Sequence, residues 1–421
     1  MRLRLTKKMK QIMLLATIGI IALLIAACGN SSIEVKNEEV NLLQEDWSTI
    51  ESLAKGSEVR IFMWGGDEGI NRYMDEWIAP RLKEQFDVTL NRTPMDINEV
   101  LQKLMTEKRA NRGAGTIDVI WLNGENFKNA KENELLWGDF VQQLPNVQAY
   151  IDMTSLDAQF DFGTPIEGLE APWGKVQFVY VYDEDKVPNP PASFEELRQW
   201  MTENPGRFTY PEASDFTGNA FLRHLLYNTV DVETLLNTPD PDAFVEESSV
   251  PMWDYLNDIK PNLWRKGETY PTSLTELDRL YSQGEVWMTM GYNEARVESL
   301  IANGTFPEST RTFVMEPGSI GNTHFLSIPF NSPNAAGAMV AINYLLSPEA
   351  QLAKMEPGMW GENMSLDPTK LSETYRQQLD SIDRGQSVLP ADVLQERFLP
   401  EVSAEYVNWI QEQWFNEVVR N

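Results

Sequence analysis

The chain is poor in the side chains that most enzymes use for catalysis. Its 421 residues include one cysteine, Cys28, and two histidines, His224 and His324. No histidine pair at zinc-site spacing occurs, and no Gly-x-x-x-x-Gly-Lys phosphate loop. A hydrolase would need a nucleophile beside a base, so we expect no enzyme, no metal and no cofactor. Because Cys28 has no partner within the chain, the fold must be stabilised by core packing rather than by a disulfide.

Basic side chains are also scarce. The chain has 35 Lys and Arg against 63 Asp and Glu, a net charge of −28. Such a charge repels nucleic acids and anionic lipid surfaces, so neither is expected as a partner. It favours attraction of cations, or simple solubility in a salty medium. The 42% of hydrophobic residues indicates a globular chain, and its length predicts two lobes.

The N-terminus has the pattern of a secretory signal. Five basic and no acidic residues lie in residues 1–11, and a 16-residue largely apolar run, residues 12–27, follows. That run is short for a membrane-spanning helix, which needs about 20 residues. Its end, Ile25-Ala26-Ala27-Cys28, resembles the lipobox of bacterial lipoproteins. The resemblance implies removal of residues 1–27 and lipidation of Cys28. The polar composition of the segment that follows, rich in Asn, Ser and Glu, predicts a flexible tether over residues 28–43. An uncleaved anchor helix is the alternative.

Strand and helix patterns alternate through the first part of the chain. Strands are predicted at residues 58–64, 87–90 and 117–122, and helices at 44–54, 71–85 and 97–110. This order predicts parallel strands with right-handed crossovers, and ligands bind such sheets at the carboxyl ends of the strands. Trp64 and Gly65 follow the first strand, and Asn123 and Glu125 follow the third.

A second block repeats the pattern. Strands are predicted at residues 175–182, 207–210 and 285–290, and helices at 193–203, 217–227 and 404–419. Ser193 with Glu196 forms a capping box, and Asp215 is placed to cap the helix that follows it. The last helix is amphipathic, and we expect it to pack rather than to carry function.

Several segments, taken in order, resemble the extracellular solute-binding lipoproteins of bacterial ABC importers. They include IFMWGGDEGIN, IDVIWLNGENF, KVQFVYVYDEDKVPNPPASFEEL, PGRFTYPEASDFTGNAFLRHLLY and INYLLSPEAQ. The chain is most similar to the branch of thiamine-, polyamine- and iron-type binding proteins. The resemblance implies an α/β, periplasmic-binding-protein-like fold: two α/β lobes joined by crossing hinge strands, with a ligand cleft between them.

The resemblance also implies a division of the chain and a set of partners. Residues 175–182 and 285–291 would cross between the lobes. Lobe 1 would hold residues 44–175 and 292–345, and lobe 2 residues 176–291 and 346–421. The partners would be a small-molecule ligand and an ABC permease with its ATPase. The protein would be a monomer, attached to the outer face of the cell membrane through its lipid anchor only.

Residues in or beside turns that contain glycine or proline are the candidate ligand contacts. They are Trp64, Gly65, Asp67, Asn123, Glu125, Trp173, Gln177, Tyr210, Asp215, Tyr292, Asn293, His324 and Trp360. Aromatic faces attract cations, and carboxylates pair with them. These residues favour a cationic or heteroaromatic ligand of thiamine or polyamine type. Sugars or other neutral solutes are the alternative, as is a sensory lipoprotein that transports nothing. His224, in an apolar helix, is expected to be structural.

Overall fold

The computed structural model describes residues 41–238, 240–241 and 248–420. Cys28, the predicted signal and most of the predicted tether lie outside these residues. Leu42–Asn421 is one compact unit. At its start, Leu42 and Leu43 pack against a hydrophobic core instead of ending a flexible tether. No helix among the described residues has both the length and the apolarity needed to cross a bilayer.

Lobe 1 is built on a seven-stranded sheet with the order β11-β6-β10-β3-β1-β2, to which β12 attaches beside β10. Its strands are β1 (Glu58–Met63), β2 (Thr89–Pro94), β3 (Val119–Leu122), β6 (Glu170–Gln177), β10 (Ser319–Ser327), β11 (Asn363–Met364) and β12 (Phe398–Leu399). β1 pairs in parallel with both β2 and β3, as predicted from the alternation of strands and helices. β10 runs antiparallel to β3 and β6.

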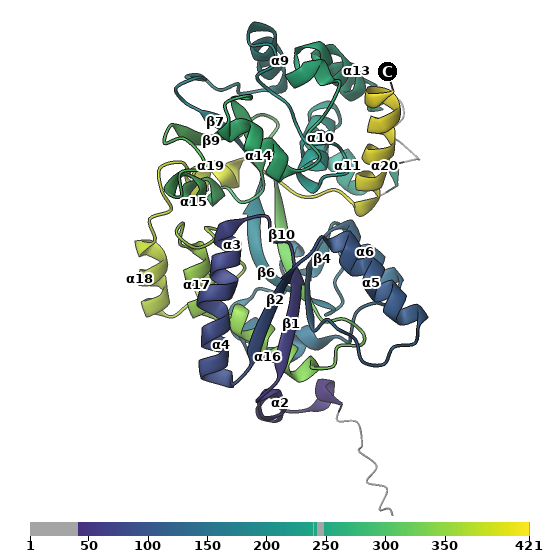
Figure 1. The fold of residues 1–421 in the computed structure, drawn as a ribbon, viewed down its shortest axis with the longest axis vertical. Coiled ribbons are helices and arrows are strands. Elements are labelled where there is room, and N and C mark those ends of the chain that lie inside the picture. Colours follow the sequence, from purple (N-terminus) through teal and green to yellow (C-terminus); the bar gives the residue numbers. More distant parts are fainter. Residues whose placement is uncertain (1–40, 239, 242–247, 421) are drawn as a thin grey trace, which may run out of the picture. The chain divides into compact units, whose positions relative to one another are not determined.

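Helices flank this sheet and cover its apolar faces (Figure 1). They are η1 (Leu42–Gln44), α2 (Trp47–Ala54), α3 (Glu68–Arg72), the π-helix η2 (Tyr73–Ile78), α4 (Ala79–Phe86), α5 (Ile97–Arg109), α6 (Glu125–Glu132), η3 (Phe140–Gln143), α7 (Pro145–Tyr150), α8 (Leu156–Gln159), α16 (Ala335–Leu345), α17 (Pro348–Met355), η7 (Pro368–Lys370) and α18 (Glu373–Ser381). A short hairpin, β4 (Phe160–Asp161) with β5 (Thr164–Pro165), lies between α8 and β6.

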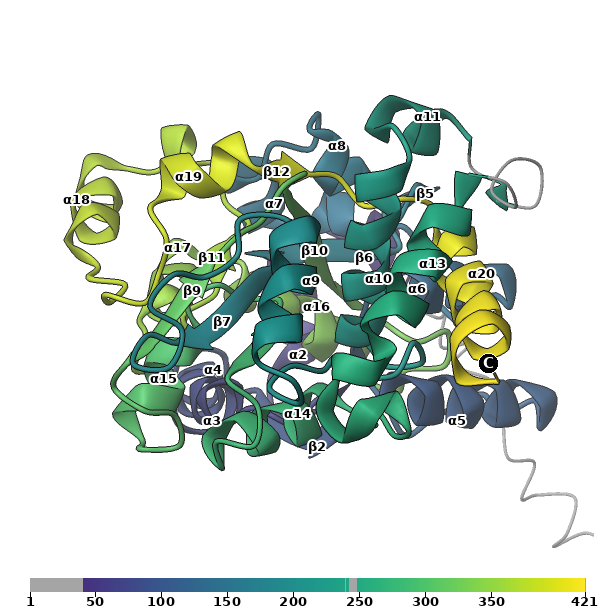
Figure 2. The ribbon, with the colours of Figure 1, turned by 90° about the horizontal axis from the view of Figure 1, so that it is seen from above.

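Lobe 2 is built on a three-stranded antiparallel sheet with the order β8-β7-β9. Its strands are β7 (Val179–Asp183), β8 (Met288–Gly291) and β9 (Thr310–Phe313). Its helices are α9 (Phe194–Glu203), α10 (Phe216–Thr229), α11 (Val232–Asn237), α13 (Val250–Ile259), η5 (Lys260–Asn262), η6 (Trp264–Gly267), α14 (Leu274–Ser282), α15 (Arg296–Ala302), α19 (Ala391–Glu396), α20 (Ala404–Trp414) and η8 (Phe415–Val419). Figure 2 views this lobe from above, with α9, α10 and α13 together and α20 beside them.

The fold class is confirmed, but the chain divides between the lobes differently from the prediction. The expected second crossing, residues 285–291, is wrong, because β8 pairs with β7 inside lobe 2. The chain instead returns to lobe 1 on β10. Residues 292–318 therefore stay in lobe 2, where Val297 and Phe313 join its core. Conversely, residues 346–371 complete the core of lobe 1 through Leu352 and Leu371. Figure 1 shows α18 beside α17 in lobe 1.

Two local predictions have opposite outcomes. The predicted caps are confirmed: the Ser193 side chain accepts a hydrogen bond from Glu196 N, and the Asp215 side chain caps α10. The strand predicted at residues 207–210 is wrong. Its carbonyls accept hydrogen bonds from residues outside any strand: Trp287 N donates to Arg207 O at 2.9 Å, and Trp264 N, at the start of η6, donates to Phe208 O at 2.8 Å.

Candidate ligand-binding site

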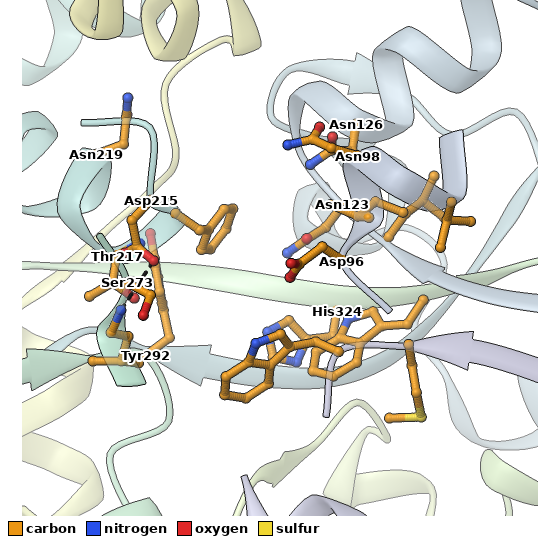
Figure 3. Close-up of a pocket in the computed structure, with 18 of the residues that line it drawn as sticks. Asp96, Asn98, Asn123, Asn126, Asp215, Thr217, Asn219, Ser273, Tyr292 and His324 are labelled. Atoms are coloured by element: carbon orange, nitrogen blue, oxygen red, sulfur yellow. Dashed lines mark hydrogen bonds between the residues drawn. The ribbon is translucent and has the colours of Figure 1, made fainter. Parts of the chain in front are cut away.

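A cavity of about 530 Å³ lies where the loops of the two lobes face each other. Lobe 1 lines it with the carboxyl ends of β1, β2 and β3 and with the helix starts that follow them. Lobe 2 lines it with the starts of α10 and α14 and with the turn after β8. Figure 3 shows Asp96, Asn123 and His324 on one side and Asp215, Thr217 and Ser273 on the other. The site thus lies at the edge that a parallel sheet predicts.

Three rings form one aromatic wall of the cavity. The centroids of Trp121 and His324 are 4.8 Å apart, and those of Trp121 and Trp360 are 5.6 Å apart. The His324 and Trp360 rings are stacked, with 20° between their planes. Trp64 also lines the cavity and is 37% exposed. Such faces suit flat or cationic ligands.

Lobe 1 contributes to the cavity lining carboxylate and amide oxygens that have few hydrogen-bond partners within the described part of the chain. Asp96 precedes α5, is exposed, and makes no side-chain capping bond to that helix. Glu125 Oε2 and Asn126 Oδ1, at the start of α6, are buried without a hydrogen-bond partner among the described residues. Burial raises the pKa of Glu125, an effect that the charge of Arg223 opposes. These groups are free to accept hydrogen bonds from a ligand.

Two other carboxylates at the cavity accept hydrogen bonds from backbone N–H groups. Asp67 Oδ1 accepts from Ile70 N at 3.0 Å and so caps α3. Asp215 accepts from Thr217 N, Gly218 N and Leu274 N, at 2.9, 3.0 and 3.2 Å, and thereby ties the starts of α10 and α14 together. Burial raises the pKa of both carboxyls, and the backbone bonds oppose that rise. Both side chains shape the wall rather than offer a free charge.

A hydrogen-bond chain runs from the cavity wall into the junction between the lobes. Asn123 Nδ2 donates to Asn322 Oδ1 at 2.8 Å, and Asn322 Nδ2 donates to Glu401 Oε1 at 3.3 Å. Tyr292 donates its hydroxyl proton to the same Glu401 oxygen at 2.6 Å. Arg223 Nη2 donates to the Tyr292 oxygen at 2.9 Å. Asn123 in lobe 1 and Tyr292 in lobe 2 both line the cavity, so one buried network joins its two walls.

The C-terminal helix α20 packs in lobe 2, as predicted, and also borders the cavity. Val407 and Gln411 on this helix line the cavity. The helix also reaches lobe 1, because Glu405 forms an ion pair with Lys128 on α6 and Ala404 N donates to the Phe162 carbonyl at 3.2 Å. It therefore closes one side of the cavity while its other face packs in lobe 2.

Comparison with known proteins identifies the family. The bacterial extracellular solute-binding protein family matches residues 77–365. The Escherichia coli K12 protein YnjB is 38% identical over 374 residues, which cover 88% of this chain and 93% of YnjB. The chain belongs to the bacterial extracellular solute-binding proteins.

Solved structures of solute-binding proteins share the fold at low sequence identity. The periplasmic binding protein AfuA of Actinobacillus pleuropneumoniae, solved with fructose-6-phosphate, gives a TM-score of 0.60 at 13% identity over 86% of this chain and 98% of AfuA. The spermidine/putrescine substrate-binding protein PotD of Streptococcus pneumoniae gives 0.59 at 17% identity, also over 86% of this chain and 98% of PotD.

Most of the predicted site residues of this solute-binding protein line the cavity. They are Trp64, Asp67, Asn123, Glu125, Asp215, Tyr292, Asn293, His324 and Trp360. Asn293 has a positive φ of 67°, and its Nδ2 donates to the Trp360 carbonyl at 3.2 Å, which joins the two lobes.

The other predicted residues lie outside the cavity lining. Tyr210 is fully buried in lobe 2, stacked on Phe221 at 4.7 Å. Trp173 is fully buried beneath the aromatic wall. Gln177 Nε2 donates to the Ser319 and Leu394 carbonyls at the lobe junction. Gly65 follows β1 but is absent from the lining. An aromatic residue beside a glycine or proline thus does not distinguish a wall residue from a core residue.

Sequence reasoning missed several lining residues. Among them are Asp96, Asn98, Trp121, Thr217 and Ser273. A usable signal existed for Asp96, because it follows β2, the third parallel strand whose carboxyl end reaches the same edge. Trp121 gave no such signal, since it lies inside the apolar strand β3. In the described part of the chain, no group of three or more His, Cys, Asp and Glu side chains is arranged to hold a metal ion.

Proposed function

We propose that this protein is the solute receptor of an ABC importer, which captures a small cationic or heteroaromatic ligand and delivers it to a membrane permease. A lipid on Cys28 would hold it at the outer face of the membrane. The observation that carries the proposal is the cavity between the lobes, where aromatic rings share the lining with Asp96 and Glu125. Asp96 makes no capping bond, and Glu125 Oε2 has no hydrogen-bond partner among the described residues.

The charged side chains that line the cavity support a cationic ligand, because the arginine among them is paired and two carboxylates form no ion pair in the described part of the chain. Arg296 lines the cavity, but Asp278 binds its guanidinium through both carboxylate oxygens, at 2.8 and 3.0 Å. Asp96 and Glu125 in lobe 1 remain available. A positive group on the ligand would satisfy them, while an anionic ligand would be repelled.

The fold alone does not select the ligand. AfuA was solved with a sugar phosphate and PotD is described as a polyamine-binding protein, yet both resemble this chain to the same degree. The choice therefore depends on the lining residues. Asn98, Asn123 and Asn126 would also suit a neutral solute such as a sugar, which we keep as the second candidate.

Identification of the bound solute is the first experiment. Native mass spectrometry of protein purified without refolding should detect any ligand that remains bound. Calorimetry with thiamine, spermidine and glucose then tests the classes. For a cationic ligand, Asp96→Asn and Glu125→Gln should each weaken binding about 10-fold, the scale of a lost charge contact. Unchanged affinity in both variants, or binding of glucose alone, would favour the neutral-solute alternative.

Two further measurements test transport and anchoring. Deletion of the gene should abolish uptake of the identified solute, whereas a purely sensory protein would leave uptake intact. Cys28→Ala should release the protein into the medium or leave the uncleaved precursor in the membrane. Normal processing and normal membrane retention of that variant would refute the lipid anchor.

A further inference from the structure

A lysine and a glutamate are buried as an ion pair beneath the aromatic wall. Lys354 on α17 and Glu362 in the turn before β11 are both inaccessible to solvent, with 3.1 Å between Nζ and Oε1. Removing two charges from water is costly, and hydrophobic residues of similar volume would often serve stability equally well. The position of this pair therefore calls for an explanation beyond stability.

The surroundings of the ion pair are shaped to hold it. Lys354 Nζ also donates to the Trp173 carbonyl at 2.6 Å, and it lies 5.6 Å from the centre of the Trp173 ring and 5.3 Å from that of Trp360. Gly174 supplies the space, because a Cβ at this position would clash with Glu362 Oε1 and Lys354 Nζ. The pair thus packs against Trp360 of the wall and against Trp173 beneath it.

The second oxygen of the carboxylate reaches the binding site. Glu362 Oε2 lies 3.0 Å from Nδ1 of His324, a residue that lines the cavity. Burial alone would raise the pKa of Glu362, but the charge of Lys354 and the hydrogen bonds with Lys354 and His324 outweigh it and lower the pKa. An ionised carboxylate can only accept a hydrogen bond, so the proton must be on Nδ1. In the neutral ring, Nε2 is then a hydrogen-bond acceptor.

The backbone and the neighbouring rings fix the orientation of this imidazole. The pairing of β10 with β6 shifts register between His324 and Phe325, and bulges of this kind redirect side chains next to binding sites. The ring centroids of Trp121 and Trp360 lie 4.8 and 6.4 Å from that of the imidazole, and Glu362 contacts its Nδ1. Few rotations are therefore left to the ring.

Building on the proposed function, we propose that Lys354 and Glu362 are positioning residues for His324. They hold its ring so that Nε2 accepts a hydrogen bond from an N–H or O–H group of the ligand. Because the rings of Trp121 and Trp360 lie next to this imidazole in the cavity lining, the preferred ligand is a flat ring that carries an amino group or a ring N–H. This selects heteroaromatic amines over aliphatic polyamines, whose chains would not use the aromatic faces.

Nitrogen NMR of the ligand-free protein tests the positioning directly. The chain has only two histidines, so His224→Gln assigns both sets of signals. At a pH where the ring is neutral, His324 should carry its proton on Nδ1 in the wild type. In Glu362→Gln the amide can donate to Nδ1, and the proton should move to Nε2. A wild-type His324 protonated on Nε2, or a tautomer unchanged by Glu362→Gln, would overturn the proposal.

A double variant guards against a folding defect in Glu362→Gln. Lys354→Met with Glu362→Leu removes both charges together, so no lone buried charge remains. His324 should then lose its fixed Nδ1–H form while the circular dichroism spectrum stays native. A His324 that keeps the Nδ1–H form in this folded double variant would also overturn the proposal.

Addition of thiamine to the labelled wild type provides the ligand arm of the test. Thiamine carries an aminopyrimidine ring, and its binding should shift the His324 Nε2 resonance. The affinity for thiamine should fall about 10-fold in Glu362→Gln, which corresponds to the loss of one hydrogen bond in a buried site. Thiamine binding that leaves this resonance unmoved would contradict the contact. If thiamine does not bind, the assigned ligand class fails, while the tautomer measurement still decides the positioning role and the receptor function is judged by uptake.

Discussion

Arg223 Nε lies 3.1 Å from Glu401 Oε2, and the arginine side chain is fully buried. The pair joins α10 to the segment before α20, next to the crossing strand β10. Burial opposes the charge of Arg223, but Glu401 and Tyr292 hold its pKa above the usual value. Because Asn322 and Tyr292 also donate to Glu401, this ion pair is the centre of the network between the two walls of the cavity.

Removal of one partner of this ion pair should therefore destabilise the fold strongly. Arg223→Met leaves Glu401 as an unpaired buried charge, and we expect the free energy of unfolding to fall by about 3–5 kcal/mol. Urea denaturation measures this change. The double variant Arg223→Met/Glu401→Leu should recover much of the loss, because neither charge remains. A single variant as stable as the wild type would show that the network contributes little.

Sequence patterns predicted those features of the site that depend only on residues adjacent in the sequence. Asp215 was recognised as a helix cap because it precedes an apolar helical pattern, and it does cap α10. Its third bond, to Leu274 N, joins residues 59 positions apart, and no local pattern encodes that contact. The bond also explains why Asp215 is less available to a ligand than its place in the sequence suggests.

Contacts between distant segments account for the remaining errors. Glu401 and α20 reach the cavity only through partners in other parts of the chain, such as Tyr292 and Lys128. The amphipathic pattern of α20 predicted a buried face but not which elements it would meet. The crossing strand was misplaced for the same reason: the residues of β8 are as apolar as those of a hinge strand, and only pairing with β7 assigns them to lobe 2.

Substitution of Asp215 should lower the stability of the fold, whereas substitution of Asp96 should not. Asp215→Ala removes the acceptor for three backbone N–H groups at two helix starts, so the free energy of unfolding should fall by about 1–2 kcal/mol. Asp96→Ala, on the opposite wall, removes no capping bond and should leave it unchanged within about 0.5 kcal/mol. Thermal denaturation of both variants is the measurement. Equal losses in the two variants would contradict the assigned roles.

Tyr210 should matter for stability and not for ligand affinity. Its ring stacks on Phe221, and its hydroxyl accepts a hydrogen bond from Trp414 Nε1 at 3.1 Å. Tyr210→Ala should cost about 3–5 kcal/mol through the cavity that it leaves. Tyr210→Phe keeps the ring and should bind the native solute as the wild type does in calorimetry. A loss of affinity in Tyr210→Phe would show that the Tyr210 hydroxyl contributes to ligand binding.

His224 makes the fold sensitive to acid. Its Nδ1 lies 2.7 Å from the Ala220 carbonyl, and its Nε2 accepts from Ile320 N at 3.0 Å, so the ring is neutral and holds α10 against β10. Burial lowers its pKa from 6.5 to about 3. Between these values the unfolded chain binds a proton that the folded chain does not. The stability contribution of His224 is therefore complete above pH 6.5 and declines as the pH falls toward 3.

The decline should reach about 1.4 kcal/mol per pH unit, the effect of one proton. His224→Gln cannot take up that proton, so the stability advantage of the wild type should shrink as the pH falls from 7 to 4. Urea denaturation of both proteins across this range measures the difference, in which the titration of all other groups cancels. Parallel curves would mean that His224 is protonated in the folded protein as readily as in the unfolded chain. Its two hydrogen bonds to Ala220 and Ile320 would then not hold a neutral ring.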